Sequence, residues 1–433
     1  MANKNISNVA KVSTLLRTDS VFVEIGGAVR RIKIEDLMNS INQGNEQLLR
    51  QVAWGIPLQP SGITSTNWGR IGNVVMYDEY KRNCGRYLVT NNGKAAKLSP
   101  TDSSVYADGT PLDESKGHIM TIRPRLYYFV KEDPVSGNTY VWFSQLPIGG
   151  HFIEQDVSGA YIGSMAGGAL TSRSGLAPAG LKDINQFWAA AQVNGKDWGL
   201  CSYDIYQKKL VALGLSEYGD TNIQARLGYG VCGSEKKTLW AEAAKLKTGA
   251  TKSLGDGFGK IPIEVTNGAN VGVDCSRVSL LGTEDPYGWL YTTLQGIYFG
   301  SSGNSAQKGT EVFIYEGNRI PTSSEFSNHP SGKYRELTRL ITGGYISKMN
   351  IGEFFDLIPS AIGGGSSSYW SSYNSASDST RQIPMFGGYA DSNPYNGLCS
   401  LHSAKIEESR QMHIGTRLAY YGPIVFVDGR EIV

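Results

Sequence analysis

The stretch Tyr369–Tyr420 combines short apolar runs, paired glycines and a segment rich in aromatic and small polar residues. It contains YWSSYN at 369–374, GGY at 387–389, NGL at 396–398 and IGTRL at 414–418. Glycines interrupt short apolar runs, which predicts strand fragments separated by turns. Tyrosine, serine and asparagine dominate between them, and these residues are typical of surfaces that bind a partner. The stretch therefore predicts a β-rich region that carries binding loops.

The composition of the whole chain agrees with a turn-rich, β-rich protein. Glycine accounts for 53 of 433 residues and charged residues for 18%, against typical values of about 7% and 25%. The formal net charge is +2 and no basic face is visible, so we expect no nucleic-acid binding. No apolar run approaches a membrane span and the start lacks an apolar signal core, so we expect folding in a cytoplasm without membrane insertion. Five widely spaced cysteines favour thiols over a disulfide framework.

Residues 1–53 differ from the remainder and predict a hairpin followed by helices. Two glycines separate the alternating runs 21–25 and 28–34, so Ile25 should pair with Ala28 in a tight turn. One helix should follow from Glu35, and a second short one should begin after Asn45. A segment of this size cannot bury its own apolar face. It therefore docks either on the rest of the chain or on another protein.

Residues 54–433 contain no convincing linker, so we expect them to form one region. Alternating runs predict strands at 118–123, 125–130 and 139–143. Apolar residues spaced three and four apart predict a helix at 183–191, with weaker helical patterns at 235–247 and 351–357.

Pieces of this region, taken in order, resemble the C-type-lectin-like domains of bacteriophage receptor-binding proteins. The resemblance covers about three-quarters of the chain. The matching pieces before the C-terminal stretch are GHIMTIRPRLYY at 117–128, AYIGS at 160–164, LTSRSG at 170–175, the helical pattern at 183–191, GLSEYGDTNIQARLGYG at 214–230 and GTEDPYGWLY at 282–291. The variety is that of the major tropism determinant, a target of diversity-generating retroelements, and formylglycine-generating enzymes use the same fold. Tyr389 and Thr416 depart from the family, because many members have tryptophan and an aromatic residue there.

The resemblance implies an α+β, β-rich chain in which a C-type-lectin-like region, 54–433, presents variable-type loops at about 361–396. Aromatic rings on these loops would stack on sugar rings, and amides and charges would bond hydroxyl groups. The ligand-binding residues expected on this basis are Tyr369, Trp370, Tyr373, Asn374, Asp378, Arg381, Tyr389, Asp391, Asn393, Tyr395 and Asn396. For Trp370, a place in the core is equally expected. The aromatic residues expected to pack rather than bind are Trp289, Tyr291, Phe313, Phe354 and Phe355.

The first 53 residues resemble the attachment modules of gut-bacteriophage fibre proteins, of the crAss-like phages that infect Bacteroidales. An ordinary N-terminal subdomain is an equally good reading. If the resemblance holds, the module anchors the chain to other virion proteins, of the capsid or the tail. The anchoring residues expected are Val21, Phe22, Val23, Ile25, Arg30, Arg31, Ile32, Ile34 and Leu37.

The function implied is that of a virion protein, a head or tail fibre assembled in the bacterial cytoplasm. It would attach the particle to a glycan or protein of the host surface, most simply as a trimer. Two alternatives stay open: a capsid decoration protein without a receptor role, and a formylglycine-generating-like oxidase that uses Cys399. Retroelement diversification of 369–396 is a further hypothesis, which an imperfect template copy near the gene would support.

Catalytic, cofactor and metal sites are not indicated. Cys399 and His402 would fall on opposite faces of a strand, so they do not form a thiol dyad. The five histidines lack metal-ligand spacing. Glu284-Asp285-Pro286 and Asp391-Ser-Asn-Pro394 are better explained as turns than as a calcium site. We expect no enzymatic activity.

Overall fold

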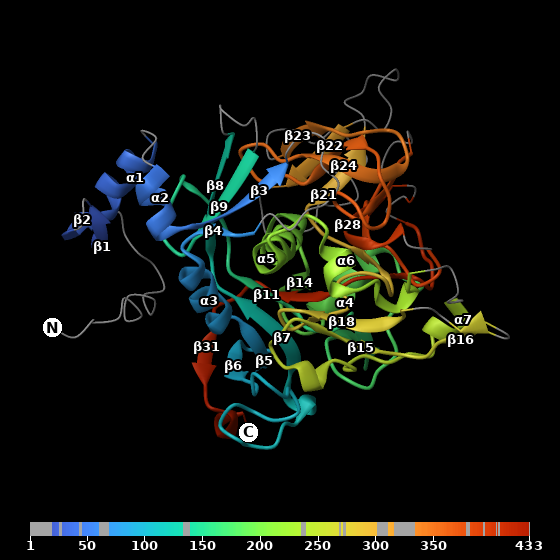
Figure 1. Cartoon of the computed structure of the whole chain (residues 1–433). Helices are drawn as coiled ribbons and strands as arrows, with labels where there is room; N and C mark the ends of the chain where they lie inside the picture. Colours follow the sequence, from blue (N-terminus) through green and yellow to red (C-terminus); the bar gives the residue numbers. More distant parts are fainter. Residues whose placement is uncertain are drawn as a thin grey trace.

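Strands dominate the part of the chain that the structure describes, and helices lie between the sheets (Figure 1). The computed structural model describes residues 20–25, 28–42, 46–59, 69–132, 139–234, 240–267, 270–271, 274–300, 311–315, 334–377, 382–392, 395–403, 405 and 408–432. The chain is therefore a β-rich α+β protein, as the sequence predicts.

The N-terminal hairpin and helices form as predicted and pack on a five-stranded sheet of the same chain. Strands β1 (Ser20–Ile25) and β2 (Ala28–Lys33) pair antiparallel with Ile25 opposite Ala28. Helices α1 (Ile34–Asn42) and α2 (Glu46–Val52) follow. Their apolar side chains share a buried cluster with Trp142, Leu146 and Ile148. Figure 1 shows these elements at one side of the molecule, next to β8 and β9.

The five-stranded sheet that receives this segment has the order β10-β8-β9-β3-β4. Its strands are β3 (Trp54–Gln59), β4 (Ile71–Gly72), β8 (Leu126–Glu132), β9 (Thr139–Ser144) and β10 (His151–Ile153). Helix α3 (Val74–Asn83) covers it. The Trp54 ring is fully buried and lies 5.4 Å and 6.0 Å from the rings of Tyr77 and Tyr80 on α3.

Early and late strands meet in the central sheet, a seven-stranded sheet with the order β14-β30-β11-β7-β5-β6-β31. Its strands are β5 (Gly85–Val89), β6 (Lys94–Lys97), β7 (His118–Arg123), β11 (Asp156–Gly159), β14 (Trp198–Leu200), β30 (Leu418–Tyr420) and β31 (Val425–Val427). Helix α4 (Ile184–Gln192) packs on it and begins with a capping box formed by Asp183 and Gln186.

A second seven-stranded sheet, here called the C-terminal sheet, has the order β25-β24-β26-β28-β27-β20-β29. Its strands are β20 (Tyr291–Thr293), β24 (Gly344–Asn350), β25 (Ile358–Ile362), β26 (Tyr373–Ser375), β27 (Met385–Gly387), β28 (Gly397–His402) and β29 (Ile414–Gly415). One face packs on the π-helix η3 (Tyr203–Gln207) and on α5 (Lys208–Tyr218). The Tyr203 and Phe386 rings lie 5.7 Å apart in this interface.

Smaller elements complete the fold. A three-stranded sheet joins β21 (Ile297–Gly300), β22 (Glu311–Tyr315) and β23 (Tyr334–Thr338), and another joins β15 (Gly259–Pro262), β18 (Ser276–Leu280) and β19 (Thr283–Glu284). Two hairpins pair β12 (Ser164–Ala166) with β13 (Ala169–Thr171) and β16 (Thr266–Asn267) with β17 (Asn270–Val271). The short helices are α6 (Ile223–Leu227) and α7 (Trp240–Ala243).

A buried polar network joins two of the sequence pieces on which the resemblance rests. The Arg277 guanidinium contacts the carboxylates of Glu284 and Asp285 at 2.9 Å and 2.5 Å. Arg417 donates to the backbone carbonyls of Glu284 and Asp285. All four side chains are almost completely buried. The network explains why GTEDPYGWLY and IGTRL, more than 120 residues apart, are brought together.

One expected helix did not form, and one observed helix was not expected. Residues 351–357 form turns, because the Asp356 carboxylate is held by Lys208 and Arg335 from other elements and Phe355 has a positive φ of 54°. Helix α5 was not predicted. It is buried on nearly all sides and so shows no polar stripe that would reveal a helical period.

Candidate functional site: an aromatic face on the C-terminal sheet

The register of the C-terminal sheet places aromatic side chains from several strands on its outer face. Tyr345 on β24 pairs directly with Tyr373 on β26. Ser375, two residues beyond Tyr373, lies opposite His402 on β28. Alternate residues of a strand share a face, so Tyr345, Tyr373 and His402 lie on one side. The intervening residue Asn374 points to the other side with Leu401, and both are buried.

Three tyrosines at one end of this face form a group that we call the tyrosine triad: Tyr345, Tyr373 and Tyr395. The Tyr373 and Tyr395 ring centroids are 4.3 Å apart, and Tyr345 lies 5.3 Å and 6.0 Å from them. The Ser400 hydroxyl accepts from the Tyr373 amide and donates to the Tyr395 carbonyl. Tyr395 is 41% exposed and the other two are half-buried. The triad is therefore an ordered but accessible aromatic surface.

A second group, here called the histidine cluster, continues the aromatic face across β20 and the ends of β27, β28 and β29. It consists of Trp240, Tyr291, Tyr389, His402 and His413. Tyr389 stacks on His413 at 4.3 Å, and Tyr291 lies 5.0 Å from Tyr389 and 5.2 Å from His402. All five side chains are half-buried.

Burial keeps the polar groups of the aromatic face uncharged. It lowers the pKa of His402 to about 4 and also lowers that of His413, so both imidazoles are neutral at pH 7. It raises the pKa of Tyr345 and of Tyr291 to about 12, so their hydroxyls keep the proton and can donate hydrogen bonds. Such a face suits a neutral ligand that has both an apolar side and hydroxyl groups.

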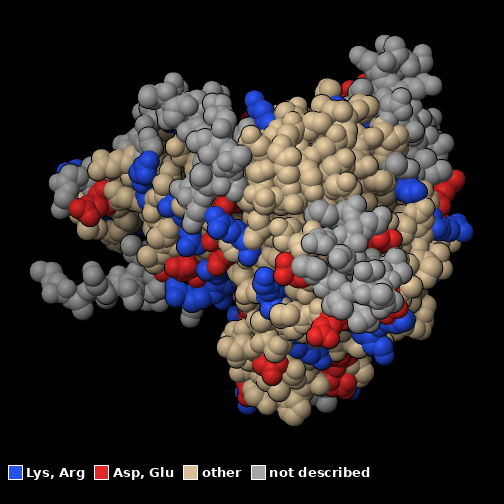
Figure 2. All heavy atoms as spheres, turned by 45° about the vertical axis from the view of Figure 1, so that its right-hand side comes forward, with Lys and Arg blue, Asp and Glu red and all other residues tan. Residues whose placement is uncertain are grey.

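Charged side chains are unevenly distributed over the face of the molecule that Figure 2 shows. Figure 2 shows acidic and basic side chains intermingled over the lower part of the visible face and a broad, mostly uncharged area above them. That area lies at the height of β22 to β24 in Figure 1.

The predicted ligand-binding residues divide into three sets. Tyr369, Tyr373, Tyr389 and Asp391 are half-buried and Tyr395 is exposed, so a surface partner can reach them. Asn374 and Asn396 are buried, which corrects the expectation that they contact a ligand, and Trp370 takes the core place that was the alternative to binding. Asp378, Arg381 and Asn393 lie outside the described residues.

The buried members have identifiable structural roles. Trp370 packs in the main apolar core, and the loop before it is tied down because Asn222 and Thr221 donate to the carbonyls of Ser367 and Tyr369. Asn374 donates to the Thr342 carbonyl.

Asn396 is buried against a glycine in the turn that follows β27. A Cβ added at Gly388 would lie 1.9 Å from the Asn396 Oδ1, so only glycine leaves room for this side chain. Gly388 also has a positive φ of 71°, which favours glycine independently of the space. Burial of Asn396 and the choice of glycine at 388 therefore depend on each other.

The predicted anchoring residues also separate by exposure. Val21, Val23, Ile34 and Leu37 are buried within the chain itself, so they are not available to another protein, and Ile32 is half-buried. Phe22 is 59% exposed, and Arg30 and Arg31 are exposed. The side chain of Ile25 lies outside the described part.

Sequence reasoning missed Tyr345, His402 and His413 and assigned Tyr291 to the core. Of the aromatic residues expected to pack rather than bind, Trp289, Phe313 and Phe355 are buried, Tyr291 is half-buried and Phe354 is 37% exposed. For the three missed residues, the one signal in the sequence was that Tyr345 alternates with the apolar Ile346, as expected for a strand with one buried face.

The thiol of Cys399 does not approach His402. Cys399 and Leu401 are alternate residues of β28, and both are buried on its inner face. His402 lies on the outer face. Burial raises the pKa of the Cys399 thiol, which is opposite to the activation of a nucleophile. All five cysteines are buried thiols. Within the described ranges, no group of three or more His, Cys, Asp or Glu side chains could hold a metal ion, and no helix is long and apolar enough to cross a membrane.

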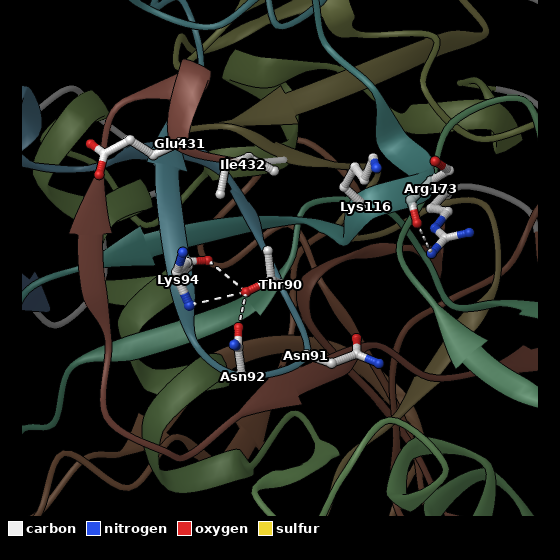
Figure 3. Close-up of a pocket in the computed structure, with 9 residues that line it drawn as sticks. Thr90, Asn91, Asn92, Lys94, Lys116, Arg173, Glu431 and Ile432 are labelled. Carbon is white, nitrogen blue, oxygen red and sulfur yellow. Dashed lines mark hydrogen bonds between the residues drawn. The ribbon is translucent and has the colours of Figure 1, made fainter.

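A polar hollow of about 490 Å³ lies at the turn between β5 and β6, away from the aromatic face. In Figure 3, Lys94 and Glu431 lie on one side of it and Lys116 and Arg173 on the other. Arg173 already donates to the carbonyls of Gly117 and Ser115. The cations therefore do not converge on one point.

A scan against protein-family models and a search of curated proteins both found no match for this chain.

Proposed function

We propose that this chain is a bacteriophage fibre protein that attaches the particle to a host-surface glycan through its aromatic face. The observation that carries the proposal is the tyrosine triad, in which three tyrosines present rings and hydroxyls at the outer face of a sheet. Aromatic rings with polar tips stack on the apolar faces of sugar rings and bond their hydroxyls. The resemblance to lectin-like phage receptor-binding proteins supports the same function.

The exposed side of the N-terminal hairpin is the proposed contact to other virion proteins. Phe22 and Arg31 are direct cross-strand neighbours and both are exposed. The paired changes Phe22→Ser and Arg31→Glu should reduce incorporation of the protein into particles. Incorporation at the wild-type level would remove this surface from the proposal.

Adsorption of purified protein to host cells tests the attachment function. Tyr373→Ala and Tyr395→Ala together should weaken saturable binding by about 10- to 100-fold, because each aromatic contact contributes about 0.5–1.5 kcal/mol. Phe426→Ala is the matched control, since Phe426 is 60% exposed on β31 of a different sheet. Equal binding by the double variant and the wild type would refute the role of the triad.

Two further outcomes separate the alternatives. Absence of binding by folded wild-type protein would favour a decoration protein without a receptor role. Fibres of this kind are oligomeric, so mass measurement in solution should give a multimer, with a trimer as the first expectation. A monomer at high concentration would count against a fibre.

A further inference from the structure

A cavity on the other side of the C-terminal sheet has the features of a second binding site. Its volume is about 430 Å³, within the roughly 300–1,000 Å³ of small-molecule pockets. It opens between β8 and β10 of the five-stranded sheet, the start of α5, and β23. The same π-helix that lines it packs through Tyr203 on Phe386. Phe386 lies opposite Leu401 and therefore on the buried face, away from the tyrosine triad.

The π-helix η3 supplies the polar floor of this cavity. A π-helix is rare and is often found at functional sites. It places Asp204 in the lining, where Oδ1 accepts from Lys208 at 2.6 Å and lies 3.4 Å from Arg335. Among the described residues, no hydrogen bond or ion pair involves Oδ2, and the Asp204 side chain is 40% exposed. One carboxylate oxygen is thus held in place while the other can accept from a ligand.

Aromatic rings form the opposite wall and are themselves fixed. His151 stacks on Tyr128 at 5.8 Å and meets Phe354 edge-on at 5.3 Å. The Arg335 guanidinium lies 4.5 Å from the centre of the Phe354 ring.

Backbone strain helps to present Phe354 at this wall. Its neighbour Phe355 is fully buried at φ 54°, a conformation that bulky residues rarely adopt and that is often found at functional sites. The turn therefore buries one phenylalanine and leaves the other 37% exposed.

The charges of the lining balance each other. Lys208 and Arg335 contact Asp204, and Asp356 behind the wall also contacts both. Glu154 is paired with Arg125, and His151 contacts the Glu353 carboxylate. A charged ligand would find no uncompensated partner in this lining. A neutral ligand that has an apolar ring face and hydroxyl groups would stack on the aromatic wall. Its hydroxyl groups would donate to the Asp204 Oδ2 and lie next to Ser202.

We propose that this cavity binds a neutral saccharide unit, as a site separate from the tyrosine triad. Phe354 and His151 would stack on the ring, and Asp204 would accept from its hydroxyls. The two sites differ in form, because the triad is an open surface and this one is a cavity. The proposal does not require the triad to bind cells.

Ligand-observed NMR on the full chain tests the proposal, with glucose, galactose, mannose, fucose, N-acetylglucosamine and N-acetylgalactosamine as probes. Glucuronic acid and glucosamine serve as charged counterparts. At about 10 mM, above a millimolar Kd, at least one neutral sugar should receive saturation from the protein. Phe354→Ala and Asp204→Asn should each weaken that binding about tenfold or more, while Phe426→Ala and Asp428→Asn, both at exposed sites near the C-terminus, should not.

Each outcome decides the matter. No binding of any neutral sugar, or binding of the charged probes only, would overturn the proposal. Binding that survives Phe354→Ala in a protein with wild-type thermal unfolding would place the sugar elsewhere and also overturn it. Loss of cell adsorption in the triad variants bears on the attachment function alone, because this experiment uses soluble sugars.

Discussion

Replacing Lys209 by methionine should make the stability of this chain less dependent on pH. Lys209 is fully buried on α5, where its ammonium donates to the carbonyls of Pro124 and Ile153. Burial lowers its pKa from the ordinary 10.5 to about 7, against the opposing attraction of Asp156. Methionine has a similar length and no charge, so it removes the titration while filling the space.

The size of the effect follows from the two pKa values. Between pH 7 and pH 9 the unfolded chain keeps the Lys209 proton while the folded chain loses it, so the free energy of unfolding of the wild type rises with pH. At 1.36 kcal/mol per pKa unit, and with the folded group half-protonated at pH 7, the rise due to Lys209 is about 2 kcal/mol. All other groups titrate in both proteins. The stability of Lys209→Met relative to the wild type should therefore fall by about 2 kcal/mol over this range.

Urea unfolding at pH 7, 8 and 9, followed by tryptophan fluorescence, measures this difference. Lys245→Met is the matched control, because the Lys245 side chain is 70% exposed and its removal should leave the pH dependence unchanged. A constant difference between Lys209→Met and the wild type from pH 7 to pH 9 would refute the reasoning. It would mean that Lys209 keeps its proton when buried.

Substitutions at three further positions test the fold by chemical denaturation. Arg277→Met should cost about 3–5 kcal/mol, because it leaves the buried carboxylates of Glu284 and Asp285 without their partner; a loss under 1 kcal/mol would mean that they are not charged. Asp183→Ala should cost about 1 kcal/mol by removing the cap of α4, and Asp183→Ser should restore most of it. Ile34→Ala should cost about 2–5 kcal/mol if the N-terminal segment unfolds together with the rest, whereas an unchanged main transition would show that it unfolds separately.

Elements with local signals could be predicted from the sequence. The paired glycines and the alternation around them are sufficient for the β1–β2 hairpin and its register. The strands at β7, β8 and β9 follow from alternation, and α4 follows from apolar spacing, with the Asp183 cap at its start. These patterns involve residues within a few positions of one another, so no tertiary information is needed to interpret them.

The turn at 351–357 shows how a local signal fails. Ile351, Phe354 and Phe355 have helical spacing, yet the segment turns because Arg335 and Lys208 hold Asp356 from distant elements. Contacts of this kind outweigh a weak propensity. The same segment then places Phe354 at the proposed saccharide cavity.

The candidate site divides in the same way. The sequence by itself determined that 361–396 would be rich in tyrosine and small polar residues, because composition is a property of the chain. Only the tertiary structure decided which of these residues reach the surface. Tyr373 and Trp370 are three residues apart, but one lies on the aromatic face and the other in the core. The difference arises because β26 pairs with β24 and β28, through partner residues 27 to 30 positions away in the chain, and this pairing assigns Tyr373 to the outer face, whereas Trp370 precedes the strand and packs in the core.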